Sequence, residues 1–179
     1  MQTLLHFSEN PRIEVFHPHV PPTANPEDRT PMVWAVDEVH APGFWFPRDC
    51  PRACCWSIGN PLSEIGRTLI GMGGITRMHA MEAVWLERLR ACTVYAYVFD
   101  AAPFHLYNKN AGYWAATETV VPQSVAPVGD LLALHTAANI ELRIVPNLWP
   151  VIDAIIASGL EFSISRSRNA LPRASSSQG

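Results

Sequence analysis

Short apolar and alternating segments recur along the chain, and they predict several strands. Stretches rich in β-branched and aromatic residues are typical of strands, and residues 92–99 (CTVYAYVF) show this composition most clearly. By the same criterion we expect extended structure in residues 4–8, 12–16, 32–36, 52–57, 92–99, 113–121, 140–145 and 160–165.

Apolar residues at helical spacing predict helices between these strands. Met78, Met81, Trp85 and Leu89 lie on one helical face, which makes residues 78–91 the clearest predicted helix. A short helix is expected after residue 37, and longer ones at 128–138 and 148–158.

The segments between these elements carry turn residues. Residues 17–31 contain five prolines and predict an exposed loop, and residues 59–74 are glycine-rich and predict another. Because strands and helices mix without a regular βαβ alternation, the predicted class is α+β. The chain has 179 residues, so we expect one α+β domain over residues 1–173 and a disordered tail at 174–179.

The composition indicates a well-filled core and argues against nucleic acid and membranes as partners. Hydrophobic residues make up 48% and charged residues 16%, with six tryptophans. The net charge is −3 and Lys109 is the single lysine, so no basic face for extended nucleic acid is expected. No apolar run reaches the ~18 residues of a membrane span, and no signal peptide is visible. The adjacent Cys54 and Cys55 suit buried thiols in a reducing compartment, so we expect a cytoplasmic protein.

Three familiar motifs are incomplete. The glycines of residues 71–74 (GMGG) match neither the dinucleotide-binding nor the P-loop pattern. His17 and His19 do not form paired ligand spacings with the cysteines, so no metal site is predicted. A serine hydrolase is not favoured either, because no G-x-S-x-G elbow is present.

Two polar patches remain as candidates. His6 and Ser8 occupy alternate positions on the first predicted strand, which favours either a wet groove or a structural, hydrogen-bonded histidine. Arg48, Asp49 and Arg52 lie in a turn rich in proline and aromatic residues. They suit either an ion pair that fastens the turn or a clamp for a planar, anionic ligand.

The sequence around these patches resembles the bacterial family of unknown function DUF6886. The matching stretches are LLHFSENPRIEVFHPHVPPT, MVWAVDEVHAPGFWFPRDCPR, TRMHAMEAVWLERLRACTVYAYVF and LEFSISRSRNA. They span nearly the whole chain. This resemblance implies one domain and no particular activity.

A looser resemblance points to proteins similar to ADP-ribosyltransferases. It rests on the opening strand with His and Ser, the I-x-x-F-x-P step, the WA-x-D-E-x-x-A block and the segment YWAATETVVP. The resemblance implies two small, mainly antiparallel sheets around a cleft, with flanking helices. It also implies a nicotinamide dinucleotide such as NAD as ligand.

Carried over by position, the resemblance assigns a role to each candidate residue. His6 would be the first-strand residue that holds the nucleotide, and Glu118 the late acid. Ser8 and Tyr97 would support the nucleotide, and the cleft would also be lined by two arginines, Arg48 and Arg52. The usual acidic or glutamine–acid pair is replaced by one carboxylate in residues 117–119 (TET).

Two functional hypotheses follow. In the first, the protein binds a small nucleotide such as NAD and performs ADP-ribosyltransferase-like chemistry. In the second, the same groove serves a non-catalytic module that binds a small ligand or a protein. Glu118 matters in the first hypothesis and not in the second.

Overall fold

The computed structural model describes residues 2–20, 29–57, 62–70 and 72–173. The chain folds as two compact units, each built from two segments. Unit 1 comprises Met1–Trp45 and Thr93–Gly129, and unit 2 comprises Phe46–Cys92 and Asp130–Gly179. Each unit contains one sheet, and nearly all strand pairs are antiparallel, which confirms the predicted mixed class with two mainly antiparallel sheets. A single domain over 1–173 stays a prediction, and the predicted tail at 174–179 lies outside the described residues.

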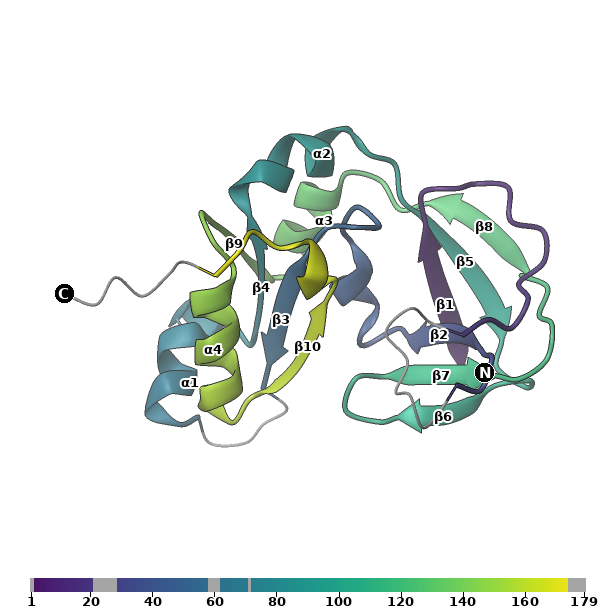
Figure 1. The fold of residues 1–179 in the computed structure, drawn as a ribbon, viewed down its shortest axis with the longest axis horizontal. Coiled ribbons are helices and arrows are strands. Elements are labelled where there is room, and N and C mark those ends of the chain that lie inside the picture. Colours follow the sequence, from purple (N-terminus) through teal and green to yellow (C-terminus); the bar gives the residue numbers. More distant parts are fainter. Residues whose placement is uncertain (1, 21–28, 58–61, 71, 174–179) are drawn as a thin grey trace. The chain divides into compact units, whose positions relative to one another are not determined.

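Unit 1 is a six-stranded antiparallel sheet in the order β6-β7-β2-β1-β5-β8 (Figure 1). Its other regular element in the described residues is a short 3-10 helix, Ala41–Phe44, after β2. The strands are β1 (Thr3–Ser8), β2 (Val33–Asp37), β5 (Tyr95–Asp100), β6 (His105–Asn108), β7 (Tyr113–Ala116) and β8 (Ser124–Pro127).

The sheet of unit 1 is bent between its two central strands. β1 pairs with β5 along all six of its residues, from Thr3 to Ser8, but with β2 only at Leu4 and Leu5. Figure 1 accordingly shows β2, β7 and β6 running across the direction of β1, β5 and β8. An aromatic and aliphatic core belongs to this sheet: Leu4, Phe16, Val33, Ala35, Tyr97, Phe99, Phe104, Ala116 and Val120.

Unit 2 is a four-stranded sheet in the order β10-β3-β4-β9, and β4 and β9 are its parallel pair. The strands are β3 (Arg52–Trp56), β4 (Arg77–Glu82), β9 (Glu141–Val145) and β10 (Glu161–Ser165). The helices are α1 (Glu64–Leu69), α2 (Leu86–Ala91), α3 (Leu131–Ala137) and α4 (Trp149–Ser158).

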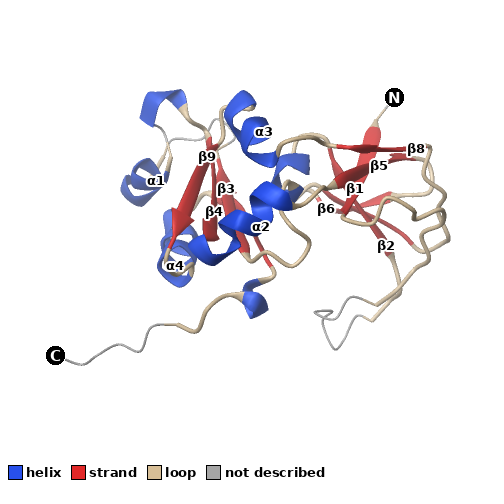
Figure 2. Cartoon of the chain, turned by 90° about the horizontal axis from the view of Figure 1, so that it is seen from above, coloured by secondary structure: helices blue, strands red, loops and turns tan. Residues whose placement is uncertain are grey.

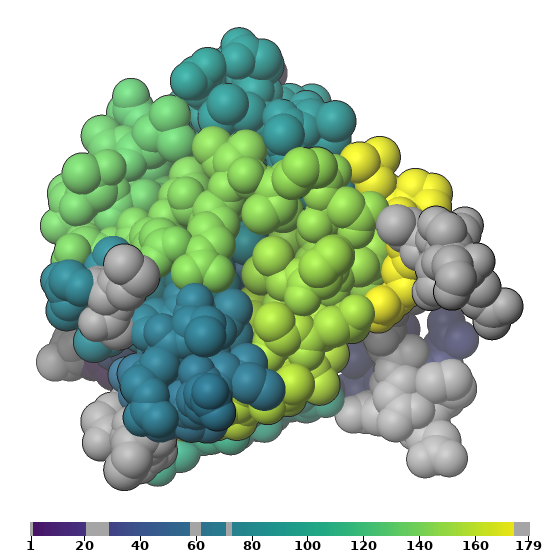
Figure 3. Space-filling model, turned by 90° about the vertical axis from the view of Figure 1, so that its left-hand side faces the viewer, coloured from purple at the N-terminus to yellow at the C-terminus, as the bar shows by residue number. Residues whose placement is uncertain are grey.

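The helices of unit 2 cover both faces of its sheet. α1 packs against α4 and α2 against α3, and Figures 1 and 2 place the two pairs on opposite sides of the sheet. Figure 3 shows α1 and α4 side by side on the outer surface of one face. The longest helix in the described ranges, α4, has 10 residues, and none of the helices there meets the length and hydropathy of a membrane span.

Most strand predictions are confirmed within a few residues, but the helix predicted over 78–91 is wrong. Its first half is strand β4, Ala83–Trp85 is a 3-10 turn, and a helix begins only at Leu86. Five of the six residues of β4 are buried, since β4 pairs with β3 and β9 and is covered on both faces. Met78 and Met81 are three residues apart, which satisfies a helical spacing, but in the strand they are buried on opposite faces of the sheet.

The glycine-rich segment also holds structure that was not predicted. Helix α1 begins after Ser63, whose hydroxyl accepts a hydrogen bond from Gly66 N at 2.9 Å. This is a side-chain N-cap. The neighbouring residues 58–61 and 71 lie outside the described part of the chain.

Candidate functional site

His6 lies at the point where β1 separates from β2. The strand pairing ends at Leu5, and the half-buried His6 ring bridges to the next strand, with Nδ1 2.9 Å from the carbonyl oxygen of Trp34. Since a carbonyl only accepts, Nδ1 carries the hydrogen of this bond. The ring packs against Phe16, with centroids 4.9 Å apart and planes at 63°. His6 therefore has a fixed ring orientation.

Glu118 lies on an exposed bend that follows β7. Two residues later, Val120 exchanges two backbone hydrogen bonds with Phe16, at 2.8 and 3.0 Å. Phe16 thus contacts the His6 ring through its own ring and the segment of Glu118 through its backbone. The segments that carry the two predicted catalytic residues, 112 positions apart in the sequence (118 − 6), meet around Phe16 in unit 1. A shared catalytic role for His6 and Glu118 stays a prediction.

Ser8 and Tyr97 hold the turn that follows β1. The Ser8 hydroxyl accepts from Asn10 N at 3.1 Å. The fully buried Tyr97 donates its hydroxyl to Asn10 O at 2.6 Å and accepts from Ile13 N at 3.0 Å. Both hydroxyls thus orient the chain between β1 and Phe16. Direct support of a nucleotide by these two residues stays a prediction.

Arg48 and Arg52 belong to unit 2. Arg52 is 6% exposed, donates to Cys50 O at 3.2 Å, and lies with its guanidinium carbon 5.6 Å from the centre of the Phe46 ring. Arg48 is exposed, and its carbonyl accepts from Arg166 Nε at 3.2 Å. The two arginines thus differ in burial, and a nucleotide-binding role for either one stays a prediction.

A second polar pair of unit 1 was not predicted from the sequence. Asp37 Oδ1 accepts from the backbone N of His40 at 2.9 Å and from its Nδ1 at 2.7 Å. Gly112 packs against this pair at φ +65°, and a Cβ there would lie 2.2 Å from His40 Nδ1. The position therefore requires glycine on both steric and conformational grounds. The D-x-x-H spacing after a predicted strand was the available signal.

Comparison with known proteins places the chain in a family. The model of a family of unknown function, DUF6886, matches residues 5–170. The chain belongs to this family. No curated protein and no solved structure matches the chain. The DUF6886 match includes segments of both units, so the family is defined by the two units together.

Unit 2 of this DUF6886 protein contains a buried histidine pair that was also not predicted. His79 on β4 and His135 on α3 are each 1% exposed, and Nδ1 of His79 lies 3.0 Å from Nε2 of His135. His135 Nδ1 donates to Leu131 O at 2.7 Å, so its Nε2 accepts the hydrogen of His79. Burial lowers the pKa of both rings, and for His79 the neighbouring His135 lowers the pKa further. The pair is therefore neutral and structural at pH 7.

Three cysteine thiols of unit 2 are buried as well. Burial raises the pKa of Cys50, Cys54 and Cys55 to about 12, so these thiols stay protonated at neutral pH. The described residues of the DUF6886 chain contain no cluster of three or more side chains suited to hold a metal ion. Unit 1 holds both predicted catalytic residues, His6 and Glu118, and it is therefore the candidate functional region.

Proposed function

We propose that unit 1 binds a nicotinamide dinucleotide such as NAD, and that His6 and Glu118 act on it in ADP-ribosyltransferase-like chemistry. The observation that carries this proposal is the position of His6. It lies where two central strands diverge, it is only half-buried, and its ring is held by Trp34 O and Phe16. A histidine ring that is already held in place can form a hydrogen bond with a ribose hydroxyl at little cost in side-chain ordering.

Glu118 supplies the charge that the chemistry needs. As the bond from the ribose carbon to nicotinamide breaks and water attacks that carbon, giving ADP-ribose, nicotinamide and a proton, positive charge develops on the carbon. A carboxylate placed beside it stabilises this transition state. Glu118 is exposed and two residues from the backbone bridge to Phe16. In this proposal Ser8 and Tyr97 are positioning residues, because their hydroxyls hold the turn after β1.

The test is the release of nicotinamide from NAD by the full chain. We expect Glu118→Gln to keep NAD binding and to lower the rate of release about 10²–10³-fold, the loss typical for one preorganised electrostatic group. His6→Ala should weaken NAD binding. The matched controls are Glu38→Gln and His105→Ala, two exposed residues of unit 1, which should retain both properties.

A thermal shift measurement completes the test. NAD at ~100 times its dissociation constant adds about 2.7 kcal/mol to the stability of the folded state. If millimolar NAD causes neither a shift of the melting temperature nor release of nicotinamide, the proposal is contradicted.

A second function, a non-catalytic binding module, has its own supporting observation. A row of aromatic rings runs across unit 1, with successive centroids 5.8, 6.2, 6.5 and 4.7 Å apart: Phe7, Phe44, Tyr113, Trp34 and Tyr107. The indole Nε1 of Trp34 is buried and has no hydrogen-bond partner among the described residues. Such a row suits a planar or apolar ligand. This module would be favoured if NAD binds the wild-type chain without release of nicotinamide, if Trp34→Leu abolishes the binding, and if Glu118→Gln leaves it unchanged.

A further inference from the structure

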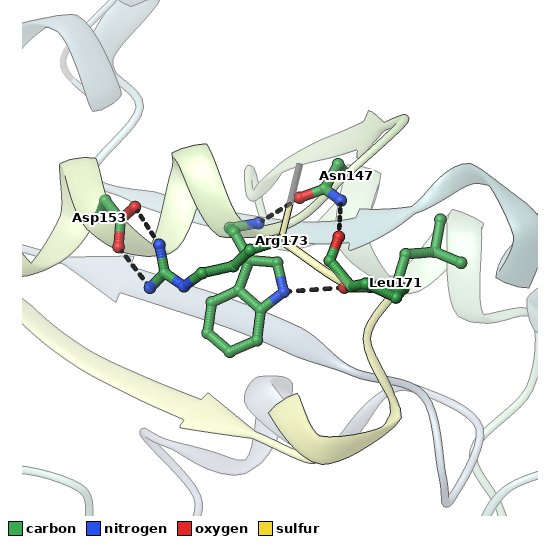
Figure 4. Close-up of polar contacts among 6 residues, drawn as sticks. Asn147, Asp153, Leu171 and Arg173 are labelled. Carbon is green, nitrogen blue, oxygen red and sulfur yellow. Dashed lines mark hydrogen bonds and ion pairs between the residues drawn. The ribbon is translucent and has the colours of Figure 1, made fainter. Parts of the chain in front are cut away.

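In unit 2, the segment that follows β10 lies across the start of α4 as an extended strap. We define the strap as Leu171–Arg173; it follows the 3-10 turn Ser167–Asn169. Figure 4 shows that its contacts run through backbone atoms and one guanidinium group. The side chain of Leu171 itself is 39% exposed.

The backbone of the strap is held at both of its first two residues. Leu171 N donates to the two carboxylate oxygens of Glu82, at 3.1 Å each, and Leu171 O accepts from Trp149 Nε1 at 2.8 Å. Pro172 O accepts from Asn147 Nδ2 at 2.9 Å. One donor and two acceptors of an extended backbone are thereby paired, as in other modes of extended-peptide recognition.

The third residue of the strap is held by its side chain. Arg173 makes a two-pronged ion pair with Asp153, with N–O distances of 2.7 and 2.9 Å. Its guanidinium carbon also lies 4.3 Å from the centre of the Trp149 ring. Trp149 and Asp153 are four residues apart on α4, so ring and carboxylate share one helical face. This arrangement favours the planar guanidinium of arginine over the compact ammonium group of lysine.

The residues that hold the strap are themselves anchored to unit 2. Glu82, at the end of β4, is fully buried and also accepts from Leu148 N at 3.1 Å. Asn147 Oδ1 accepts from Trp149 N at 3.0 Å at the start of α4. The strap, in contrast, is exposed at all three residues and belongs to no strand or helix. The residues that hold the strap are therefore fixed by other parts of unit 2. The strap contributes only backbone atoms and one arginine side chain to the contact.

We propose that Glu82, Asn147, Trp149 and Asp153 form a recognition site for an extended peptide segment with arginine at its third position, and that the strap occupies this site in cis. The partner is a protein that presents such a segment, of the type x-Pro-Arg. Proline before the arginine favours the extended conformation that the site binds, which lowers the entropy lost on binding. Because a tethered segment competes at an effective concentration of about millimolar, the partner binds once the strap is weakened or outcompeted.

The test uses the full chain and a fluorescein-labelled heptapeptide, Asn-Ala-Leu-Pro-Arg-Ala-Ser, which copies the strap. In Arg173→Gln the strap loses its ion pair and its ring contact. We expect the peptide to bind this variant about tenfold more tightly than the wild-type chain in fluorescence anisotropy. The double variant Arg173→Gln, Asp153→Asn should lose the gain. A peptide with lysine in place of arginine should also bind about tenfold more weakly.

The control is Arg90→Gln, which breaks an Arg90–Glu87 ion pair of unit 2 with similar exposure of the arginine (54%, against 56% for Arg173). It should leave peptide binding at the wild-type level. Circular dichroism establishes that each variant is folded, and Arg173→Lys replaces Arg173→Gln if the latter is not. A folded Arg173 variant that binds no peptide, equal binding by variant and wild type, or binding insensitive to Asp153→Asn would each overturn the proposal.

Discussion

The two units treat the same residue types in opposite ways. In unit 1, His6 is half-buried and bonds to a backbone carbonyl, and Glu118 is exposed. In unit 2, His79 and His135 are 1% exposed and bond to each other, and Glu82 is fully buried and accepts from backbone N–H groups. Partly accessible polar groups can act on a ligand, whereas sealed and mutually satisfied groups stabilise a fold. In the proposed function the chemistry belongs to unit 1, whereas the buried polar groups of unit 2 described above are satisfied within the fold.

The largest stability effect should come from the buried carboxylate of unit 2. Glu82→Ala removes the acceptor of Leu148 N and Leu171 N, and we expect a loss of about 3 kcal/mol in the free energy of unfolding. For a chain of this size this corresponds to about 6–12 °C in melting temperature. Glu82→Gln keeps one acceptor oxygen and should lose less. The control, Glu87→Ala at an exposed position, should change the free energy of unfolding by no more than about 0.5 kcal/mol. An equally small change in Glu82→Ala would contradict the stabilising role of the buried carboxylate.

The histidine pair should make the stability of unit 2 sensitive to acid. The pKa of His79 and of His135 is lowered in the folded state from 6.5, so below pH 6.5 the unfolded chain binds protons that the folded chain does not. Stability is therefore complete above pH 6.5 and falls as the pH drops, by up to about 1.4 kcal/mol per pH unit for each ring.

Urea denaturation between pH 7 and pH 5.5 measures this dependence. The double variant His79→Leu, His135→Phe replaces both partners by apolar groups and should flatten the profile. His105→Gln, at an exposed position of unit 1, should retain the profile of the wild type. A steep profile in the double variant would show that other groups cause the acid sensitivity.

A smaller effect is expected at the turn after β1 in unit 1. Tyr97→Phe deletes the hydroxyl that bonds Asn10 O and Ile13 N, and we expect a loss of about 1–2 kcal/mol. If the turn positions His6, the same variant should also weaken NAD binding. If stability falls but the NAD affinity is unchanged, Tyr97 stabilises the fold and does not position the ligand site.

The sequence predicted elements with a distinct pattern and missed those that depend on distant partners. Strand β1 and helix α4 followed from local chemistry, and both are present, although the N-cap of α4 is Leu148 and Asn147 lies one residue before it. Strands β6 and β8 are exposed along their whole length, so they lack the apolar pattern on which strand prediction rests. The error at 78–91 arose because β4 owes its conformation to β9, about 60 residues further along the chain.

The candidate site was predictable in part for the same reason. His6 could be singled out because a polar residue on an apolar strand is conspicuous locally. The link from His6 through Phe16 to Val120 depends on a backbone bridge between residues 104 positions apart (120 − 16), which no local pattern encodes. The His79–His135 pair joins a strand to a helix 56 residues away and was invisible for that reason.

The proposed contact between the His6 ring and a nucleotide can be measured directly. Nitrogen-15 NMR of the imidazole rings resolves the tautomer of each of the seven histidines during a titration with NAD. We expect the ring-nitrogen signals of His6 to shift progressively as NAD is added, while those of His105 and of the His79–His135 pair stay unchanged. Ring-nitrogen signals of His6 that do not move at saturating NAD would show that the ring does not contact the nucleotide.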